Sequence, residues 1–165
     1  MPVCKLYQTI NQLSSGQRLL GLDIGKKTIG LAISDPDMRV ATPLRILWRK
    51  KFTPDAQELI ETIAENNIGG LVLGWPVNMD GSQGPSCDSV RDFAHAFLRL
   101  YDIAISFQDE RLSTKAVEQE MIAADLTRQK RHLRRDALAA AWILQSALDS
   151  LPASEQERRL FEQCR

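Results

Sequence analysis

The sequence predicts an α/β fold in which a mixed five-stranded sheet carries helices on both faces. Two observations lead to it: adjacent apolar runs near the start alternate like a β-hairpin, and later strand-like runs are separated by amphipathic segments of helical period. The chain has 165 residues, of which 44% are hydrophobic and 25% charged. This is the composition of a globular domain long enough to bury a core.

The hairpin opens the predicted domain. Apolar residues alternate over 19–24 and again over 29–34, and the glycine-containing segment 25–28 between them is expected to turn. A third strand is expected over 40–48. Pro43 favours an edge position for it, because proline cannot donate a ladder hydrogen bond.

A helix and a buried strand are expected next. Thr53 is placed as the capping residue and Pro54 as the first helical residue, ahead of an amphipathic helix that ends near Asn67. The short apolar run 70–74 is typical of a central strand buried on both faces. A second amphipathic helix is expected around 90–98.

A last strand, over 103–110, is expected to lead through Ser113 and Thr114 into a third helix. The final helix is expected after a basic segment, with its apolar face formed by Ala137, Ala141, Leu144 and Leu148. The resulting order, β-β-β-α-β-α-β-α-α, is that of the ribonuclease H fold, whose central first strand carries a carboxylate. We expect a flexible extension over 1–17, an RNase H-like domain over 18–150 and a loosely attached tail over 151–165.

Composition narrows the function classes. The formal net charge is zero, so only local charge can indicate nucleic-acid binding. Three cysteines scattered along the chain and two histidines argue against a zinc site or a disulfide framework. No run approaches the roughly 18 apolar residues of a membrane span, so we expect a cytoplasmic protein without a membrane partner.

Three acidic residues fall where carboxylates are costly unless a positive charge compensates them. Asp23 lies inside a predicted strand, Glu110 ends another, and Asp136 is expected in the first turn of the last helix. Each alone also fits a structural role: a bulge, a solvated strand end or a partner of the helix dipole. Together they suit two Mg²⁺ or Mn²⁺ ions, which prefer oxygen ligands and can activate water for phosphodiester hydrolysis. Asp23 would bridge both ions, with Glu110 and Asp136 on either side.

Four ordered blocks resemble the YqgF family, also called RuvX or Holliday-junction-resolvase-like proteins. The blocks are 22–35 (LDIGKKTIGLAISD), 73–84 (LGWPVNMDGSQG), 109–114 (DERLST) and 134–140 (RRDALAA). The resemblance implies that Asp23, Glu110 and Asp136 are catalytic and bind divalent metal. It also implies an endonuclease acting on structured nucleic acid, with 5′-end processing of pre-16S ribosomal RNA favoured.

Basic residues near these acids are the expected nucleic-acid contacts. The densest cluster has five Lys or Arg in the eight positions 128–135. Arginine at a helix start opposes the macrodipole, which favours phosphate contact for Arg134 and Arg135. The expected contacts are Lys26, Lys27, Arg111, Lys115, Arg128, Lys130, Arg131, Arg134 and Arg135.

Several alternatives stay open. Trp75 and Asn78, in the glycine-rich loop 74–84, fit either substrate contact or ordinary structural roles. A DNA four-way junction is the other substrate in the same class; resolving it symmetrically would require a homodimer, whereas RNA cleavage allows a monomer. ATP-using kinases and actin-like ATPases also open with the pattern D-x-G-x-x-x-x-G seen from Asp23 to Gly30, but this chain supplies only one of the two domains such enzymes need. The last alternative is a non-catalytic nucleic-acid-binding module.

Overall fold

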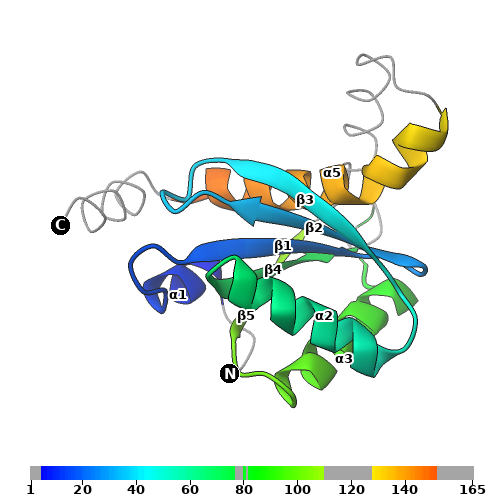
Figure 1. The fold of residues 1–165 in the computed structure, drawn as a ribbon, viewed down its shortest axis with the longest axis horizontal. Helices are drawn as coiled ribbons and strands as arrows, with labels where there is room; N and C mark the ends of the chain where they lie inside the picture. Colours follow the sequence, from blue (N-terminus) through cyan, green and yellow to red (C-terminus); the bar gives the residue numbers. More distant parts are fainter. Residues whose placement is uncertain (1–4, 77–79, 81, 110–127, 152–165) are drawn as a thin grey trace.

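The computed structural model describes residues 5–76, 80, 82–109 and 128–151. Within that part, one mixed sheet of five strands has the order β3-β2-β1-β4-β5, and helices cover both of its faces (Figure 1). The strands are β1 (Arg18–Ile24), β2 (Thr28–Ser34), β3 (Ala41–Trp48), β4 (Ile68–Trp75) and β5 (Ala104–Asp109). The predicted fold class is confirmed.

Strand direction brings several chain turns to one end of the sheet. β1 is parallel to β4, which is parallel to β5, whereas β2 is antiparallel to both β1 and β3. β1, β3, β4 and β5 therefore all end on the same side, which we call the carboxyl edge. The predicted hairpin and the edge position of β3 are confirmed.

Two hydrophobic layers hold the helices to the sheet. α2 (Phe52–Glu65) and α3 (Pro85–Leu98) cover one face, where Leu59 and Phe97 are buried against the strands. α5 (Arg128–Asp149) and α1 (Leu6–Asn11) cover the other face, where Leu144 is fully buried. β1 is central, so it contributes alternate side chains to both layers.

The predicted start of α2 is wrong by two residues. The helix begins at Phe52 after Lys51, and no side chain caps it from the N-cap position. Instead, the buried carboxylate of Asp55 accepts hydrogen bonds from the backbone N–H of Lys50 at 3.1 and 3.3 Å. The acid inside the first turn thus holds the residue that precedes the N-cap, and its charge also suits the helix dipole.

The expectation of a flexible extension is wrong for residues 6–11. They form α1, where Thr9 and Ile10 are buried, and Leu13 just beyond the helix joins the same core layer. Their close fit depends on Gly69 and Gly70 at the start of β4, where a Cβ would collide with Leu13 and Thr9. The segment has too few apolar residues for a clear helical period, so only the facing strand reveals its role.

The last helix extends further toward the N-terminus than predicted. α5 already includes Arg128, so Asp136 lies well inside the helix instead of in its first turn. Arginine, lysine and glutamine are good helix formers, and the basic segment continues the helix without any apolar period. The predicted third helix and the tail beyond Leu151 lie outside the described residues. Among the described helices, none is long and apolar enough to span a bilayer.

Candidate active site

Asp23 projects from β1 toward the α5 face of the sheet. Leu19 and Gly21, the alternate residues that precede Asp23 on β1, both face α5. Leu19 belongs to the α5 core layer, and a Cβ at Gly21 would lie 2.8 Å from Leu144 Cβ. Side chains at i and i+2 share a strand face, so Asp23 lies there as well. It is half-buried, one residue before β1 ends at the carboxyl edge.

Helix α5 makes its closest approach to the sheet beside Asp23. Gly30 is the cross-strand partner of Asp23, and a Cβ at Gly30 would overlap the backbone carbonyl of Asp136. Two residues before Gly30 on β2, the Thr28 hydroxyl donates a hydrogen bond to the Asp136 carboxylate, a contact between residues 108 positions apart. Asp23 and Asp136 therefore occupy one patch of the α5 face, and both are half-buried.

The third acid cannot be placed in the same way, because Glu110 lies outside the described residues. β5 reaches the carboxyl edge and ends at Asp109, whose register partner is Trp75 at the end of β4. Within the part of the chain that is described, no group of three or more His, Cys, Asp or Glu residues is arranged to hold a metal ion. The site as described supplies two carboxylates and a hydroxyl.

These donors fit a hard divalent cation. All of them are oxygens, the ligand type that Mg²⁺ and Mn²⁺ prefer over nitrogen or sulfur. Magnesium retains several waters and is commonly held by one or two carboxylates, so Asp23 and Asp136 are a chemically adequate start for such a site.

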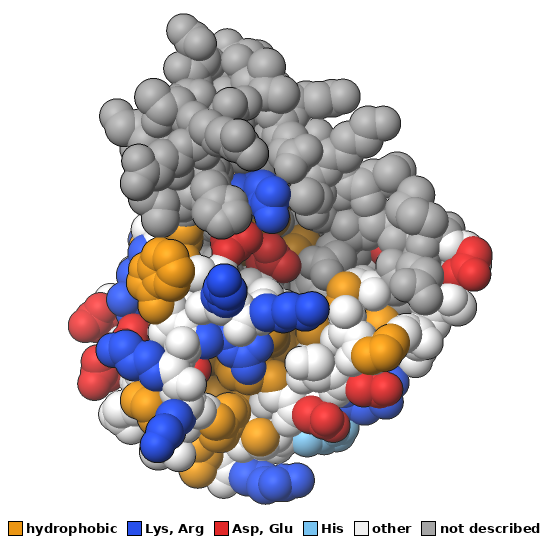
Figure 2. Space-filling model, turned by 90° about the vertical axis from the view of Figure 1, so that its right-hand side faces the viewer, with side chains coloured by type: hydrophobic (Ala, Val, Ile, Leu, Met, Phe, Trp, Pro, Cys, Tyr) orange, Lys and Arg blue, Asp and Glu red, His pale blue; other side chains and the backbone are white. Residues whose placement is uncertain are grey.

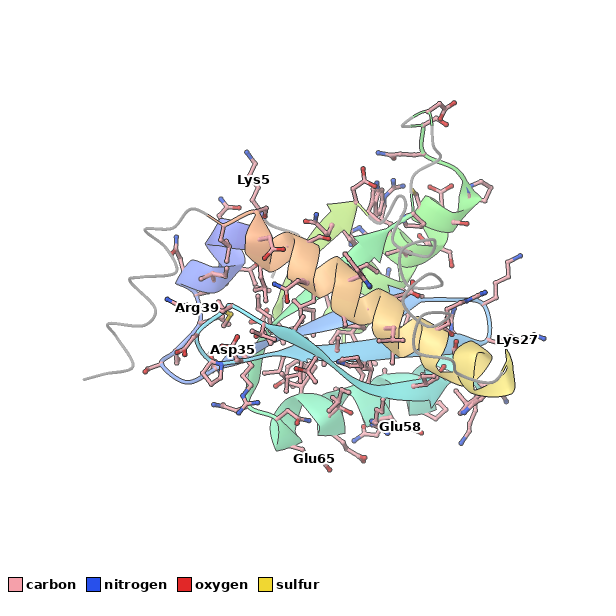
Figure 3. The ribbon with its side chains drawn as sticks, turned by 90° about the horizontal axis from the view of Figure 1, so that it is seen from above. Lys5, Lys27, Asp35, Arg39, Glu58 and Glu65 are labelled. Atoms are coloured by element: carbon pink, nitrogen blue, oxygen red, sulfur yellow. The ribbon has the colours of Figure 1, made fainter. Side chains whose placement is uncertain are left out.

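Basic side chains surround the acidic patch at the carboxyl edge. On this face of the molecule, Lys and Arg side chains border a group of Asp or Glu side chains (Figure 2). Lys26 and Lys27 are exposed in the β1–β2 turn, and Lys50 and Lys51 are exposed between β3 and α2. Lys27 extends away from the hairpin near the start of α5 (Figure 3). The edge therefore carries positive charge although the whole chain is neutral.

The dipole argument for the basic cluster is wrong. Arg134 and Arg135 lie inside α5, so their position at a helix start is no longer a reason to assign them to phosphate. Arg135 is half-buried and has an interaction partner in the structure. The side chains of Arg128, Lys130, Arg131 and Arg134, together with Arg111 and Lys115, fall outside the description, and their contacts remain predictions.

Of the two open interpretations of Trp75, the structural one is supported. Its ring packs 4.7 Å from that of Phe107, and the Arg91 guanidinium lies 5.4 Å from its centroid. These contacts attach Trp75 to the α2/α3 core layer, on the face opposite Asp23. Asn78 lies outside the described residues.

Sequence reasoning missed Thr28 and Gly30. Both alternate in step with Ala32, which faces α5, so the hairpin register places them on the same face as Asp23. The two alternating runs of the sequence predict that register, but they do not predict which helix packs on Gly30.

Structural comparison defines the class first. The fowlpox virus resolvase in complex with Holliday junction DNA matches with a TM-score of 0.52 at 14% identity, covering 81% of this chain and 98% of that one. Thermus thermophilus RuvC with a Holliday junction substrate matches with a TM-score of 0.51 at 11% identity, covering 81% of this chain and 97% of that one. The fold is thus the RNase H-like fold of resolvases.

Sequence comparison then identifies the family. The model of the RuvX family, described as Holliday junction resolvase, matches residues 17–150. A protein of Paramagnetospirillum magneticum is 49% identical over 150 residues, which are 91% of this chain and 97% of the relative. One of Rhodopseudomonas palustris is 56% identical over 133 residues, which are 81% of this chain and 83% of the relative. Both are named "Putative pre-16S rRNA nuclease". The chain belongs to the RuvX family, and its activity is that of a nuclease.

Proposed function

We propose that this nuclease is a divalent-metal-dependent endonuclease that processes the 5′ end of pre-16S ribosomal RNA in the cytoplasm. The packing of Asp136 against Gly30, the strand partner of Asp23, is the observation that carries the mechanism. The proposed substrate is supported by the relatives that bear this name and match this chain over most of both lengths.

The proposed roles follow from the position of each group. Asp23 and Asp136 hold the metal, and Glu110 completes the set from the chain that follows β5. Two Mg²⁺ or Mn²⁺ ions, when bound, supply an activated water and stabilise charge on the leaving oxygen. The Thr28 hydroxyl orients the Asp136 carboxylate from β2. Lys26, Lys27 and the predicted basic residues of 111–135 bind phosphates of the substrate.

A four-way DNA junction is the second candidate substrate. The family description and the two structural neighbours with junction DNA favour it. Symmetric resolution of a junction requires two active sites and hence a homodimer, whereas RNA processing needs only a monomer. Both substrates would use the same carboxylates.

A cleavage assay on a pre-16S 5′ precursor RNA and on a four-way junction tests the proposal. Asp23→Asn, Glu110→Gln and Asp136→Asn should each lower the rate by orders of magnitude, because each disturbs both the charge and the position of the metal. EDTA should abolish cleavage, and Mg²⁺ or Mn²⁺ should restore it. Faster cleavage of the RNA supports the proposed substrate. Faster cleavage of the junction would instead make four-way junction DNA the substrate.

Two matched variants control for loss of charge alone. Asp35→Asn and Glu65→Gln change acids at the other end of the sheet, away from the hairpin turn (Figure 3), and should cleave like wild type. Residual activity that is equal in wild type and in all three site variants would contradict the enzyme assignment.

A further inference from the structure

An exposed tryptophan adjoins the acidic patch. Trp48 is 56% exposed, although it is the last residue of β3. Its register partner is Thr28, the residue whose hydroxyl contacts Asp136. Opposed residues of an antiparallel pair project from the same face, so the indole lies on the face of the two acids. The other large exposed apolar residues in the described chain, Val40 and Leu100, lie at the opposite end of the sheet.

The backbone that carries this indole is tied to the β1–β2 turn. The N–H of Arg49 donates to the Lys27 carbonyl at 2.8 Å, and its guanidinium donates to the Gly25 carbonyl at 2.7 Å. The next N–H, of Lys50, donates to the buried Asp55 carboxylate. Trp48 is therefore presented on a fixed support, and little conformational entropy would be lost on binding.

The surroundings of the indole indicate the chemistry of its ligand. Lys27 precedes Thr28, the register partner of Trp48, and Lys50 and Lys51 follow Trp48 by two and three residues. All three are exposed, and the carboxyl edge is rich in Lys and Arg (Figure 2). A single aromatic ring among cations is too small and too charged for a protein or membrane interface of ordinary size. It suits a nucleic-acid strand, where a base stacks on an aromatic ring and cations contact the adjacent phosphates.

We propose that Trp48 is a stacking platform for an unpaired nucleobase of the substrate, and that Lys27, Lys50 and Lys51 contact the flanking phosphates. The inference rests on the proposed function only in taking a nucleic acid as substrate. It adds that the substrate presents a single-stranded or unpaired nucleotide next to the cleavage site, since a base within an intact duplex has no free face to stack.

The test combines a change in the protein with a change in the strand. The catalytically impaired Asp23→Asn protein, with and without Trp48→Ala, is titrated in Mg²⁺ with two labelled single-stranded RNAs. One RNA is normal, and the other has the same length and charge but contains abasic sites. Trp48→Ala should weaken binding of the normal strand by about fivefold or more, from the stacking energy of one base, and leave binding of the abasic strand unchanged.

Further variants separate stacking from charge and from folding. Trp48→Phe should retain most of the affinity, Trp48→Leu should lose it despite its similar hydrophobicity, and Leu100→Ala should behave like the parent. Lys50→Gln should lower the slope of log affinity against log salt by about one, whereas Trp48→Ala should leave that slope unchanged. Thermal unfolding of each variant checks the fold.

The stacking proposal is wrong if Trp48→Ala weakens binding of both strands equally or weakens binding of neither. It is also wrong if the parent protein fails to bind the normal strand. If the wild type cleaves its substrate but Trp48→Ala affects binding of the normal and abasic strands alike, only the stacking proposal is contradicted. If Trp48→Ala weakens binding of the normal strand alone and the wild type cleaves neither substrate, only the proposed function is contradicted.

Discussion

Gly30 shows how a single residue places helix α5. Because it has no side chain, the Asp136 backbone lies directly on β2, beside the strand that carries Asp23. Any Cβ would have to push backbone atoms aside, since the collision is with a carbonyl and not with the flexible end of a side chain. The position of the Asp136 carboxylate thus depends on a neighbour that contributes no side chain.

Replacing Gly30 with alanine should displace Asp136 and lower the cleavage rate of the folded protein. We expect a loss of about 1–3 kcal/mol in the free energy of unfolding, from overpacking at the helix–sheet interface. Denaturant titration measures the stability, and cleavage per folded molecule measures the displacement.

Gly21→Ala is the matched control for this substitution. A Cβ there would also press on α5, at 2.8 Å from Leu144 Cβ, but away from Asp136. It should destabilise the protein and leave the rate per folded molecule near that of wild type. Equal rates for the two variants would show that Gly30 has no special role in placing Asp136.

At the scale of elements, the junction between β3 and α2 serves both the fold and the surface. Asp55 is only 4% exposed, and it accepts the Lys50 N–H from inside the first turn of α2. This holds the exposed Lys50 and Lys51 at the carboxyl edge, two and three residues after Trp48. The hydrogen bond that fixes the chain where it enters α2 therefore also holds the proposed nucleic-acid surface in place.

Removing the Asp55 carboxylate should destabilise the protein. In Asp55→Ala the Lys50 N–H would lose its acceptor, at a cost of about 1–3 kcal/mol in the free energy of unfolding. Asp55→Asn keeps an acceptor oxygen and should lose clearly less. Urea denaturation of the two variants measures the difference, and an Asp55→Ala protein as stable as wild type would show that the N–H finds another partner.

At the scale of the whole molecule, the candidate site and the packing of α1 lie at opposite ends of the sheet. The carboxyl edge gathers Asp23, Asp136 and the basic turns, whereas α1 packs at the start of β4 at the opposite end (Figure 1). Stability and chemistry should therefore respond independently to changes at the α1 end.

Truncating Ile10 tests that independence. The side chain is 1% exposed in the α5-face core layer, so Ile10→Ala should cost about 2–5 kcal/mol of stability while the folded protein keeps its cleavage rate. Asn11→Ala, on an exposed position of the same helix, should change neither quantity. A loss of rate per folded molecule in Ile10→Ala would show that the two ends are coupled.

Several features were determined by the sequence itself. Alternation in the first two strands placed Asp23 on a strand and set the hairpin, and Pro43 marked β3 as an edge strand. Local pattern suffices for these, because the side-chain period of a strand and the missing N–H of proline act within a few residues. The resemblance in four ordered blocks identified the family.

Only the tertiary structure decided which faces meet. Hydrophobic periodicity shows that a helix has a buried side, but not that α5 would set Asp136 against Gly30 and Thr28. Nor could it show that the charged start of α5 is helical, or that α1 packs on Gly69 and Gly70, since neither segment has a clear apolar period. Contacts between residues far apart in the chain depend on the whole packing arrangement, which no local pattern contains.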